Sequence, residues 1–320
     1  MKTNVTALGE LLIDFTENGI SKQGNPILEA NPGGAPCNVL AMLCRLGKTA
    51  AFIGKVGEDQ FGYQLKASLE EVGIETAGLK MDTEVHTTLA FVHTKEDGDR
   101  EFSFYRNPGA DAMLSEEDLE EELLKNCTIF HYGSLSMTHE ASKAATKKAI
   151  HLAKEHGALL SFDPNLREPL WETLDDAKEC IDYGMRYCDI LKISDNEILW
   201  FTGKETFDEG IQFLQETYQI PLILLSMGKE GSRAYCGNEM AEVPAVLQKN
   251  TVETTGAGDT FCACILNYVL EQRWKTYSVL ELEEMLRFAN AAASIITTRK
   301  GALRVMPVRE EIDALLDKGV

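Results

Sequence analysis

The middle of this chain alternates short apolar runs with amphipathic helical patterns, and this alternation restricts the fold more than any other feature of the sequence. Strands that alternate with helices favour a parallel sheet joined by crossover helices. The apolar runs, which we predict to be strands, cover residues 128–132, 159–163, 190–193 and 221–226. The amphipathic patterns predict helices over residues 140–156, 174–187 and 207–218. We therefore expect an α/β fold.

The remainder of the chain carries further helical patterns and two pairs of strand-like segments. Helices are predicted over residues 35–46, 61–72, 257–270 and 280–297, and the last is apolar nearly all round, which predicts a buried helix. Residues 11–16 and 26–30 form one predicted β ribbon; residues 87–94 and 100–106, joined by a turn at 95–99, form another. The sequence has no internal repeat and no linker. We expect one domain, residues 1–320, with a small β-sheet inserted near its start.

The chain is strongly acidic, with 31 Lys and Arg against 51 Asp and Glu and a formal net charge of −20. This charge would repel nucleic acid, so no nucleic-acid partner is expected, and a small phosphate-bearing ligand would need a local device such as a helix N-terminus. No uncharged apolar run approaches the ~18 residues of a membrane span, and the first residues lack a signal sequence. The eight cysteines are scattered, which is typical of buried, reduced thiols. We expect a cytoplasmic protein with no membrane partner.

The strongest local signal is a run of small residues that leads into the predicted helix at 257–270. Thr255-Gly256-Ala257-Gly258 would let a ligand approach the backbone, and the first N–H groups and the dipole of the helix would hold an anion. Asp259 follows in the first turn, where its carboxylate could accept a hydroxyl proton as phosphoryl transfer begins. A helix N-cap without a ligand is the alternative. The chain completes neither the GxGxxG nor the GxxxxGK[ST] pattern, which disfavours a nucleotide dehydrogenase and a P-loop ATPase.

A second glycine-rich segment precedes the predicted helix at 35–46. Gly33 and Gly34 permit close approach to the backbone, and Asn38, one turn into the helix, offers both a donor and an acceptor to a polyhydroxy ligand. Turn chemistry alone would account for the glycines equally well. His131, at the end of a predicted strand, could border the sugar pocket, but a hydrogen-bonded strand-end histidine is the expected role.

These segments resemble the two signatures of the ribokinase-like (PfkB) carbohydrate kinases. Gly33-Gly34-Ala35-Pro36-x-Asn38, with Gly54-x-Val56-Gly57-x-Asp59-x-x-Gly62, is similar to the first signature, and Thr254-Thr255-Gly256-Ala257-Gly258-Asp259 is similar to the second. Four further segments look like those of the bacterial fructokinases of this family, at residues 9–15, 104–111, 163–167 and 191–197. The resemblance runs from about Leu8 to Pro307.

The resemblance implies a three-layer α/β/α core with a β-sheet lid, inserted here at about residues 11–31 and 86–108. It implies transfer of the γ-phosphoryl group of ATP to a hydroxymethyl group of a sugar, D-fructose in first place. Asp259 would be the catalytic base, and the N–H groups of Gly256, Ala257 and Gly258 would stabilise the transferring phosphoryl group. The implied substrate-binding residues are Asp14, Gly33, Gly34, Asn38, Arg106 and Arg167, of which Arg167, with Asn165, would lie near the phosphates. Arg106 could instead be a solvated edge charge, and Arg167 an ordinary ion pair.

The resemblance also implies a nucleotide and metal site. The residues expected around ATP are Asn165, Lys192, Ser226, Gly228, Gly231 and Asn290, with ion pairing as the alternative role of Lys192. Glu197 would organise Mg²⁺ through water. Two residues depart from the family pattern: Ser194 replaces an Asn, and Glu253 replaces an Asp. That Asp, with carbonyls of residues 296–305, binds a monovalent cation in potassium-activated members, so potassium (K⁺) activation is an open question here.

Other functions remain open from the sequence. Within the same family, the acceptor could be 2-keto-3-deoxygluconate, ribose or a nucleoside, and a keto-acid sugar would need a cation at its carboxylate. The alternative from another class is a non-catalytic sugar-binding regulator. Such a protein would be expected to lack Asp259, and Asp259 is present here. The lid of the family often pairs between subunits, and the apolar face of Phe102 and Phe104 would suit a homodimer.

Overall fold

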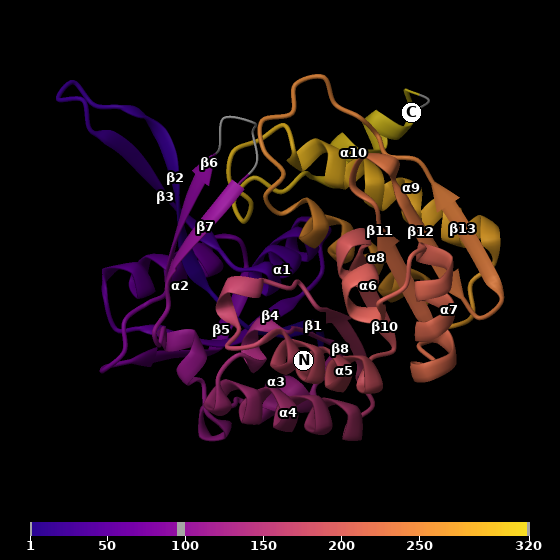
Figure 1. Cartoon of the computed structure of the whole chain (residues 1–320), viewed down its shortest axis with the longest axis horizontal. Coiled ribbons are helices and arrows are strands. Elements are labelled where there is room, and N and C mark those ends of the chain that lie inside the picture. The colour runs from indigo at the N-terminus through magenta and orange to yellow at the C-terminus, as the bar shows by residue number, and fades with distance from the viewer. Residues whose placement is uncertain (1, 95–99, 319–320) are drawn as a thin grey trace.

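The structure of the chain is a computed structural model in which residues 2–94 and 100–318 are described. In this part of the chain, the centre of the molecule is a nine-stranded sheet with the order β13-β12-β11-β10-β9-β8-β1-β4-β5 (Figure 1). The strands from β11 to β5 in this order run parallel, and the β12–β13 edge is antiparallel. The strands are β1 (Thr3–Leu8), β4 (Ala50–Gly57), β5 (Ile74–Asp82), β8 (Cys127–Gly133), β9 (Leu159–Asp163), β10 (Ile190–Ser194), β11 (Leu222–Ser226), β12 (Ser232–Cys236) and β13 (Glu239–Val243).

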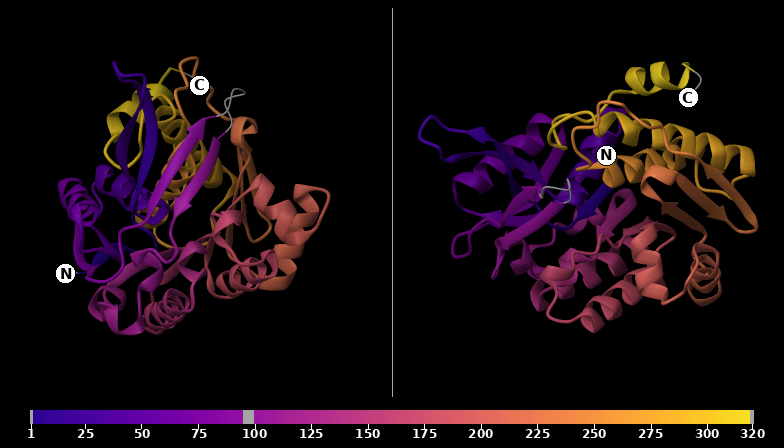
Figure 2. Two further views of the ribbon diagram at one scale, coloured as in Figure 1. Left: turned by 60° about the vertical axis from the view of Figure 1, so that its left-hand side comes forward. Right: turned by 45° about the horizontal axis from the view of Figure 1, so that its top comes forward.

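A second, four-stranded sheet forms the lid, with the order β3-β2-β6-β7. Its strands are β2 (Leu12–Ile20), β3 (Pro26–Gly33), β6 (Leu89–Thr94) and β7 (Arg100–Tyr105). The pairs β2–β3 and β6–β7 are antiparallel, as the two ribbons predicted, and β2 joins them by pairing in parallel with β6. Both views in Figure 2 show the β2–β3 hairpin extending beyond the body of the molecule. The predicted turn at 95–99 and the side chain of Phe102 lie outside the described residues.

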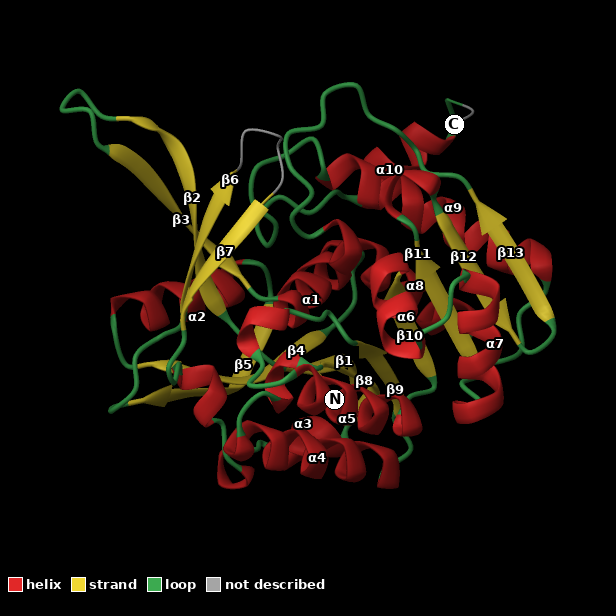
Figure 3. Ribbon diagram, in the orientation of Figure 1, coloured by secondary structure: helices red, strands yellow, loops and turns green. Residues whose placement is uncertain are grey.

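Helices cover both faces of the central sheet, which makes the three-layer α/β/α fold that was expected (Figure 3). One hydrophobic core lies between the sheet and α1, α2, α8, α9 and α10, and the other between the sheet and α3 to α7. These helices are α1 (Ala35–Arg45), α2 (Gln60–Glu71), α3 (Glu121–Lys125), α4 (Glu140–Glu155), α5 (Leu174–Tyr187), α6 (Asp195–Thr202), α7 (Phe207–Tyr218), α8 (Ala257–Gln272), α9 (Val279–Ile296) and α10 (Arg309–Leu316).

In the middle of the chain, the predicted strands and helices agree closely with those of the structure. The four predicted central strands are β8 to β11, and each pairs in parallel with the next. Helices α5 and α7 have the predicted bounds, because Thr173 and Thr206 cap them through hydrogen bonds to backbone N–H groups. The sequence analysis did not single out β1, β4, β5 or the β12–β13 hairpin. Within the described residues, no helix has the length and apolarity needed to cross a lipid bilayer.

Candidate functional site

A cleft of about 670 Å³ lies between the lid and the C-terminal ends of the parallel strands. This is the end of an open α/β sheet at which ligands bind. Its walls come from the lid, the segment after β1, the start of α1, the segments after β9 and β10, and the first turn of α8. The lining residues are Glu10, Leu12, Asp14, Gly34, Ala35, Asn38, Phe104, Leu135, Asn165, Arg167, Lys192, Asn196, Thr254, Thr255, Gly256, Gly258 and Asp259.

The start of α8 provides the expected anion-binding end of a helix. Gly256 is the N-cap residue and adopts the left-handed region at φ 76°, and a Cβ there would come within 2.8 Å of Ala302. Glycine is therefore required at this position. The helix is 16 residues long and buried over most of its length, so its first N–H groups and its dipole are held in a fixed direction. The Ala257 N–H donates to the Thr254 carbonyl at 3.2 Å, which makes it less available to an anion than its neighbours.

Asp259 lies in the first turn of α8 and lines the cleft, as its proposed role requires. Asn38 on α1 donates a hydrogen bond from Nδ2 to Asp259 Oδ2 at 2.8 Å. Burial raises the pKa of the Asp259 carboxyl, while the Asn38 hydrogen bond and the charges of Lys192 and Arg167 oppose that rise. A carboxylate with a raised pKa is a stronger proton acceptor than an exposed aspartate, which suits a general base.

Lys192 on β10 brings a positive charge to the floor of the cleft. Its Nζ lies 3.0 Å from Asp163 Oδ2 at the end of β9, and both side chains are almost fully buried. Burial would lower the pKa of Lys192, but the carboxylates of Asp163 and Glu197 outweigh it and raise the pKa. The ammonium group also lies 3.3 Å from the point where a Cβ on Gly258 would be. Lys192 is therefore charged and lies close to the first turn of α8.

The glycines of the first signature shape the opposite end of the cleft. Gly34 has φ 126°, and a Cβ on it would collide with the carbonyl oxygen of Glu10. A Cβ on Gly33 would collide with the carboxylate of Asp14, so the lid strand β2 packs directly over this turn. Asp14 and Gly34 both line the cleft together with Asn38. The structure thus brings these predicted substrate-binding residues to one wall.

Arg106, a predicted sugar-binding residue, has its guanidinium bonded to other groups of the protein. It follows β7, and its Nε donates to Asp111 Oδ2 at 2.8 Å in an ion pair that is almost fully buried. Its other nitrogens donate to Thr138 Oγ1 at 2.7 Å and to the Leu135 carbonyl at 3.2 Å. Arg106 is not among the described residues that line the cleft. It ties the end of the lid to the body of the molecule, and it is not the solvated edge charge that was the alternative.

The residues around the nucleotide are only partly brought together. Asn165, at a positive φ of 46°, and Arg167 line the cleft with Lys192. Strain of this kind concentrates at functional sites. Ser226, Gly228 and Gly231 belong to the end of β11 and the turn into β12, outside the described lining of the cleft.

Asn290 has a structural position on α9. Its Oδ1 accepts from Ser232 Oγ at 2.9 Å, and its Nδ2 donates to the carbonyls of Val243 and Pro244 at 3.1 and 3.2 Å. The side chain is 8% exposed. These contacts join α9 to β12 and to the end of β13, and the described part of the cleft does not include Asn290.

Glu197 connects the segments that follow β9 and β10. Its Oε1 accepts from the Leu166 N–H at 2.8 Å, and its Oε2 accepts from the N–H and the hydroxyl of Ser194 at 2.9 and 2.8 Å. Burial would raise the pKa of Glu197, but Lys192 and the Ser194 and Leu166 donors lower it overall. Ser194 therefore caps α6 where the family pattern has Asn. No group of three or more His, Cys, Asp or Glu side chains suited to direct metal binding occurs in the described ranges 2–94 and 100–318.

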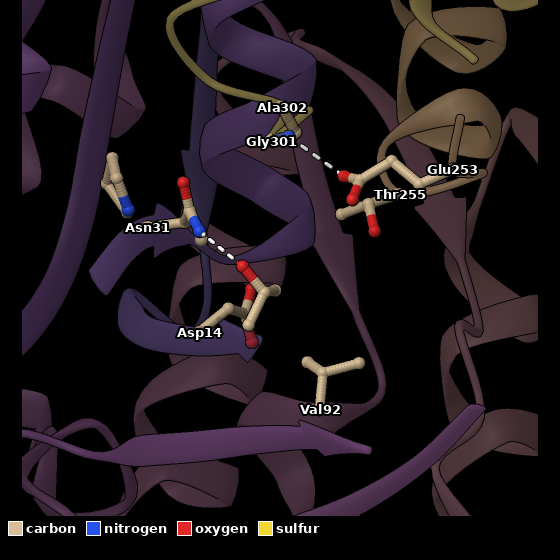
Figure 4. A pocket seen from close by; sticks show the side chains of 10 residues that line it. Asp14, Asn31, Val92, Glu253, Thr255, Gly301 and Ala302 are labelled. Atoms are coloured by element: carbon tan, nitrogen blue, oxygen red, sulfur yellow. Dashed lines mark hydrogen bonds between the residues drawn. The ribbon is translucent and has the colours of Figure 1, made fainter. Parts of the chain in front are cut away.

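Glu253 lies beside a small pocket between the lid and the start of α8 (Figure 4). Its Oε1 accepts a hydrogen bond from the Gly301 N–H at 2.8 Å. Asp14 and Asn31 of the lid line the same pocket, together with Thr255 and Gly301. The longer side chain thus spans the distance to the loop after α9.

Sequence reasoning assigned no ligand-binding role to several residues that line the cleft. Glu10, Phe104, Thr254 and Asn196 lie in segments that carry the family resemblance, whereas Leu135 carried no local signal. His131 is buried, and its Nδ1 lies 2.9 Å from Ser161 Oγ, which confirms a hydrogen-bonded histidine. His131 also lines a small recess beside the cleft with Glu10, Asp163 and Asn165.

Transfer of a phosphoryl group to a hydroxyl requires a base at the acceptor and fixed positive charge at the phosphates, and this cleft has both beneath a lid. Together with the three-layer fold, these properties define a small-molecule kinase. The sequence pattern of the pfkB family carbohydrate kinase matches residues 2–309. The chain belongs to this family and is a sugar kinase, which confirms the resemblance noted in its motifs.

Named relatives and solved structures agree with this assignment. Fructokinase-1 of Zea mays is 39% identical over 316 residues, which are 98% of this chain and 98% of the relative. A crystal structure of fructokinase with bound ATP from Xylella fastidiosa has a TM-score of 0.90 at 29% identity and covers 100% of this chain and 99% of its own. A double-mutant fructokinase from Vibrio cholerae O395, with fructose, ADP and a potassium ion bound, has a TM-score of 0.86 at 28% identity over 98% and 99% of the two chains.

Proposed function

We propose that this sugar kinase transfers the γ-phosphoryl group of ATP to the 6-hydroxyl of D-fructose. The observation that carries the proposal is the position of Asp259, which shares one cleft with Asp14 and Gly34 on one side and with Lys192 and Arg167 on the other. A sugar on the first side and the triphosphate on the second would meet at this carboxylate. The resemblance to named fructokinases supports fructose as the acceptor.

The residues support a direct in-line transfer. The sugar 6-hydroxyl gives its proton to the Asp259 carboxylate as its oxygen forms a bond to the γ-phosphorus. The bond between that phosphorus and the bridging oxygen of ADP breaks, and ADP leaves with the electron pair. The N–H groups at the start of α8 and the ammonium group of Lys192 stabilise the charge on the transferring group. Closure of the lid would exclude water and limit hydrolysis of ATP.

The donor set fits a magnesium ion that arrives with the nucleotide. Mg²⁺ keeps several of its waters, and Glu197 already accepts three hydrogen bonds from the protein, so it would act on the ion through water. Bound Mg²⁺ neutralises charge on the phosphates. We propose a different outcome for potassium: the Gly301 N–H at Glu253 Oε1 places a donor where a cation would need oxygen ligands, so dependence on K⁺ should be weak.

Two features favour a neutral sugar over a keto-acid. The carboxylate of Asp14 on the lid accepts hydrogen bonds from hydroxyl groups and would repel a substrate carboxylate. The guanidinium of Arg106, which follows β7 of the lid, is hydrogen-bonded to Asp111, Thr138 and Leu135. Arg167 remains as a cation in the cleft, so 2-keto-3-deoxygluconate is the second candidate.

A coupled assay of ADP release tests this function. Fructose, ribose, 2-keto-3-deoxygluconate and adenosine are compared with Mg·ATP, and turnover with fructose well above the others is expected. Preference for 2-keto-3-deoxygluconate would favour the second candidate. Sugar binding by calorimetry without any ADP release would favour the non-catalytic regulator.

The lid supports a further proposal about assembly. The β2–β3 hairpin exposes Ile20, Ile27 and Leu28, and β3 is an edge strand of the lid sheet. Such an edge with apolar side chains favours pairing with another chain. We propose a homodimer through the lid. Light scattering on the wild type and on Ile20→Lys would test it, and a monomeric wild type would contradict it.

A further inference from the structure

Glu10 is a buried carboxyl group that the mechanism above does not use. It follows β1 and Gly9, is 5% exposed, and lines both the cleft and the recess beside it. Its Oε1 accepts a hydrogen bond from the N–H of Ala35, the first residue of α1, at 2.8 Å. Burial raises the pKa of this carboxyl to about 7, although the Ala35 N–H opposes the rise. Burying a carboxyl costs free energy, so its place in the fold calls for a specific contact.

The hydrogen bond from the Ala35 N–H to Glu10 replaces the one that the N-cap residue of a helix usually accepts. Gly34 occupies the N-cap position and has no side chain that could accept from the first N–H groups of the helix. Glycine cannot be replaced there, because φ is 126° and a Cβ would collide with the Glu10 carbonyl oxygen. Glu10 therefore holds the turn on two sides: its carbonyl packs against Gly34, and its carboxyl caps Ala35.

The same turn carries the residues that face the sugar side of the cleft. Gly34 and Asn38 line the cleft, and Asn38 also donates to Asp259. A shift in the start of α1 would therefore move one sugar-binding surface without touching Lys192 or Arg167 on the nucleotide side. A change at Glu10 should therefore weaken binding of the sugar and leave binding of ATP unchanged.

We propose that Glu10 is a positioning residue for the sugar, which caps α1 from the β1–β2 connection and holds the Gly33–Gly34 turn and Asn38 in the geometry that binds the acceptor. The inference rests on the proposed function in one respect, namely that the sugar binds at this turn. Glu10 acts through the Ala35 N–H and not as a base.

The test compares Glu10→Leu, which has no acceptor, with Glu10→Gln, which keeps one. Glu10→Leu should raise the KM for fructose about tenfold or more and leave the KM for ATP within about twofold, since a lost hydrogen bond to a charged group has this order of effect. Glu10→Gln should restore the KM for fructose to within about threefold of the wild type. Calorimetry of fructose binding without nucleotide should show the same order of affinities.

Asp189→Leu is the matched control. Asp189 Oδ2 also accepts a hydrogen bond from a backbone N–H, that of Leu160 at 2.8 Å. Asp189 precedes β10, so it lies at the N-terminal ends of the parallel strands, opposite the cleft. This variant should lose thermal stability and keep both KM values. If Glu10→Leu does not fold, Glu10→Ser carries the same expectation.

Two outcomes would overturn the proposal: an unchanged KM for fructose in Glu10→Leu, or an equal rise in both KM values. Failure of the proposed function looks different, because the wild type would then not phosphorylate fructose. In that case the comparison is made with the sugar that the wild type does bind.

Discussion

Asn38 on α1 donates a hydrogen bond from Nδ2 to Oδ2 of Asp259 on α8 at 2.8 Å. The bond joins two helices, although the two residues are 221 positions apart in the chain. The bond fixes the orientation of the carboxylate that faces the cleft. Burial raises the pKa of Asp259, and the Asn38 donor lowers it because it stabilises the ionised form. Asn38 thus lines the cleft and lowers the pKa of the carboxyl group that we propose as the base.

Replacement of Asn38 by Ala should move the acid limb of the pH profile of kcat to higher pH. Loss of the donor removes a contribution that lowers the pKa of Asp259, so the carboxyl would hold its proton to higher pH and the base would be lost earlier on acidification. The profile is measured with saturating sugar and ATP. Asn267→Ala, further along α8, serves as control because its amide is far from the first turn. An unmoved acid limb in Asn38→Ala would refute this role.

Asp259→Ala should reduce kcat by about 10²- to 10⁴-fold, the contribution of a general base. Fructose affinity measured by calorimetry should fall by only about tenfold, because a hydrogen bond between a sugar hydroxyl and a charged group contributes about 1.5–3 kcal/mol. The N–H groups of α8 and the side chain of Lys192 remain in place in this variant. Turnover close to that of the wild type would remove Asp259 from the role of base.

The sequence predicted the parts of this molecule that depend on local signals. Helix α5 has its predicted bounds because Thr173 caps it and its buried residues recur at helical spacing. Gly256 was predicted to start an anion-binding turn because small residues directly before an apolar helix let an anion reach the first N–H groups of that helix. These features can be read within a window of a few residues.

Contacts between distant segments could not be predicted in this way. Arg106 was expected to face the sugar, yet its partner Asp111 follows after a turn that folds it back, and Thr138 comes from another part of the chain. Asn290 was carried over to the nucleotide site by resemblance, while its amide binds Ser232 and two carbonyls near β13. Glu10 gave no signal of its own, because its function depends on the N–H of Ala35 on another element.

Exchange of sodium for potassium should change kcat/KM for fructose by less than about twofold, because the Gly301 N–H donates to one carboxylate oxygen of Glu253 and would repel a cation bound at that oxygen. Glu253→Asp should gain stimulation by potassium, since the shorter side chain would release the Gly301 N–H and leave space in the pocket of Figure 4. Both proteins are assayed in matched salts at constant ionic strength. Strong potassium stimulation of the wild type would contradict the prediction.

The ion pair between Arg106 and Asp111 should contribute strongly to stability. Their side chains are 5% and 2% exposed, so Asp111→Ala would leave a buried, unpaired guanidinium and lower the free energy of unfolding by about 3–5 kcal/mol. Denaturant unfolding measures this change. The surface pair of Arg233 and Glu242 provides the control, and Glu242→Ala should have little effect. If Arg106 binds sugar in solution, Asp111→Ala would instead leave stability unchanged and alter only the KM for fructose.

His131 should make the protein less stable as the pH falls below neutrality. Burial, with a smaller contribution from the charge of Lys192, lowers the pKa of its imidazole from 6.5 to about 3. Below the pKa of the unfolded chain, the unfolded state binds a proton that the folded state does not, so this contribution to stability is complete above about pH 6.5 and is lost progressively towards pH 3. At pH 5 the loss of stability is about 2 kcal/mol, from ~1.5 pKa units at ~1.4 kcal/mol each.

The variant His131→Asn tests this contribution, because Asn can keep the contact with Ser161 but does not titrate. Between pH 7.5 and 5, its free energy of unfolding should fall about 2 kcal/mol less than that of the wild type. Equal slopes in the two proteins would show that the buried imidazole does not limit stability in acid.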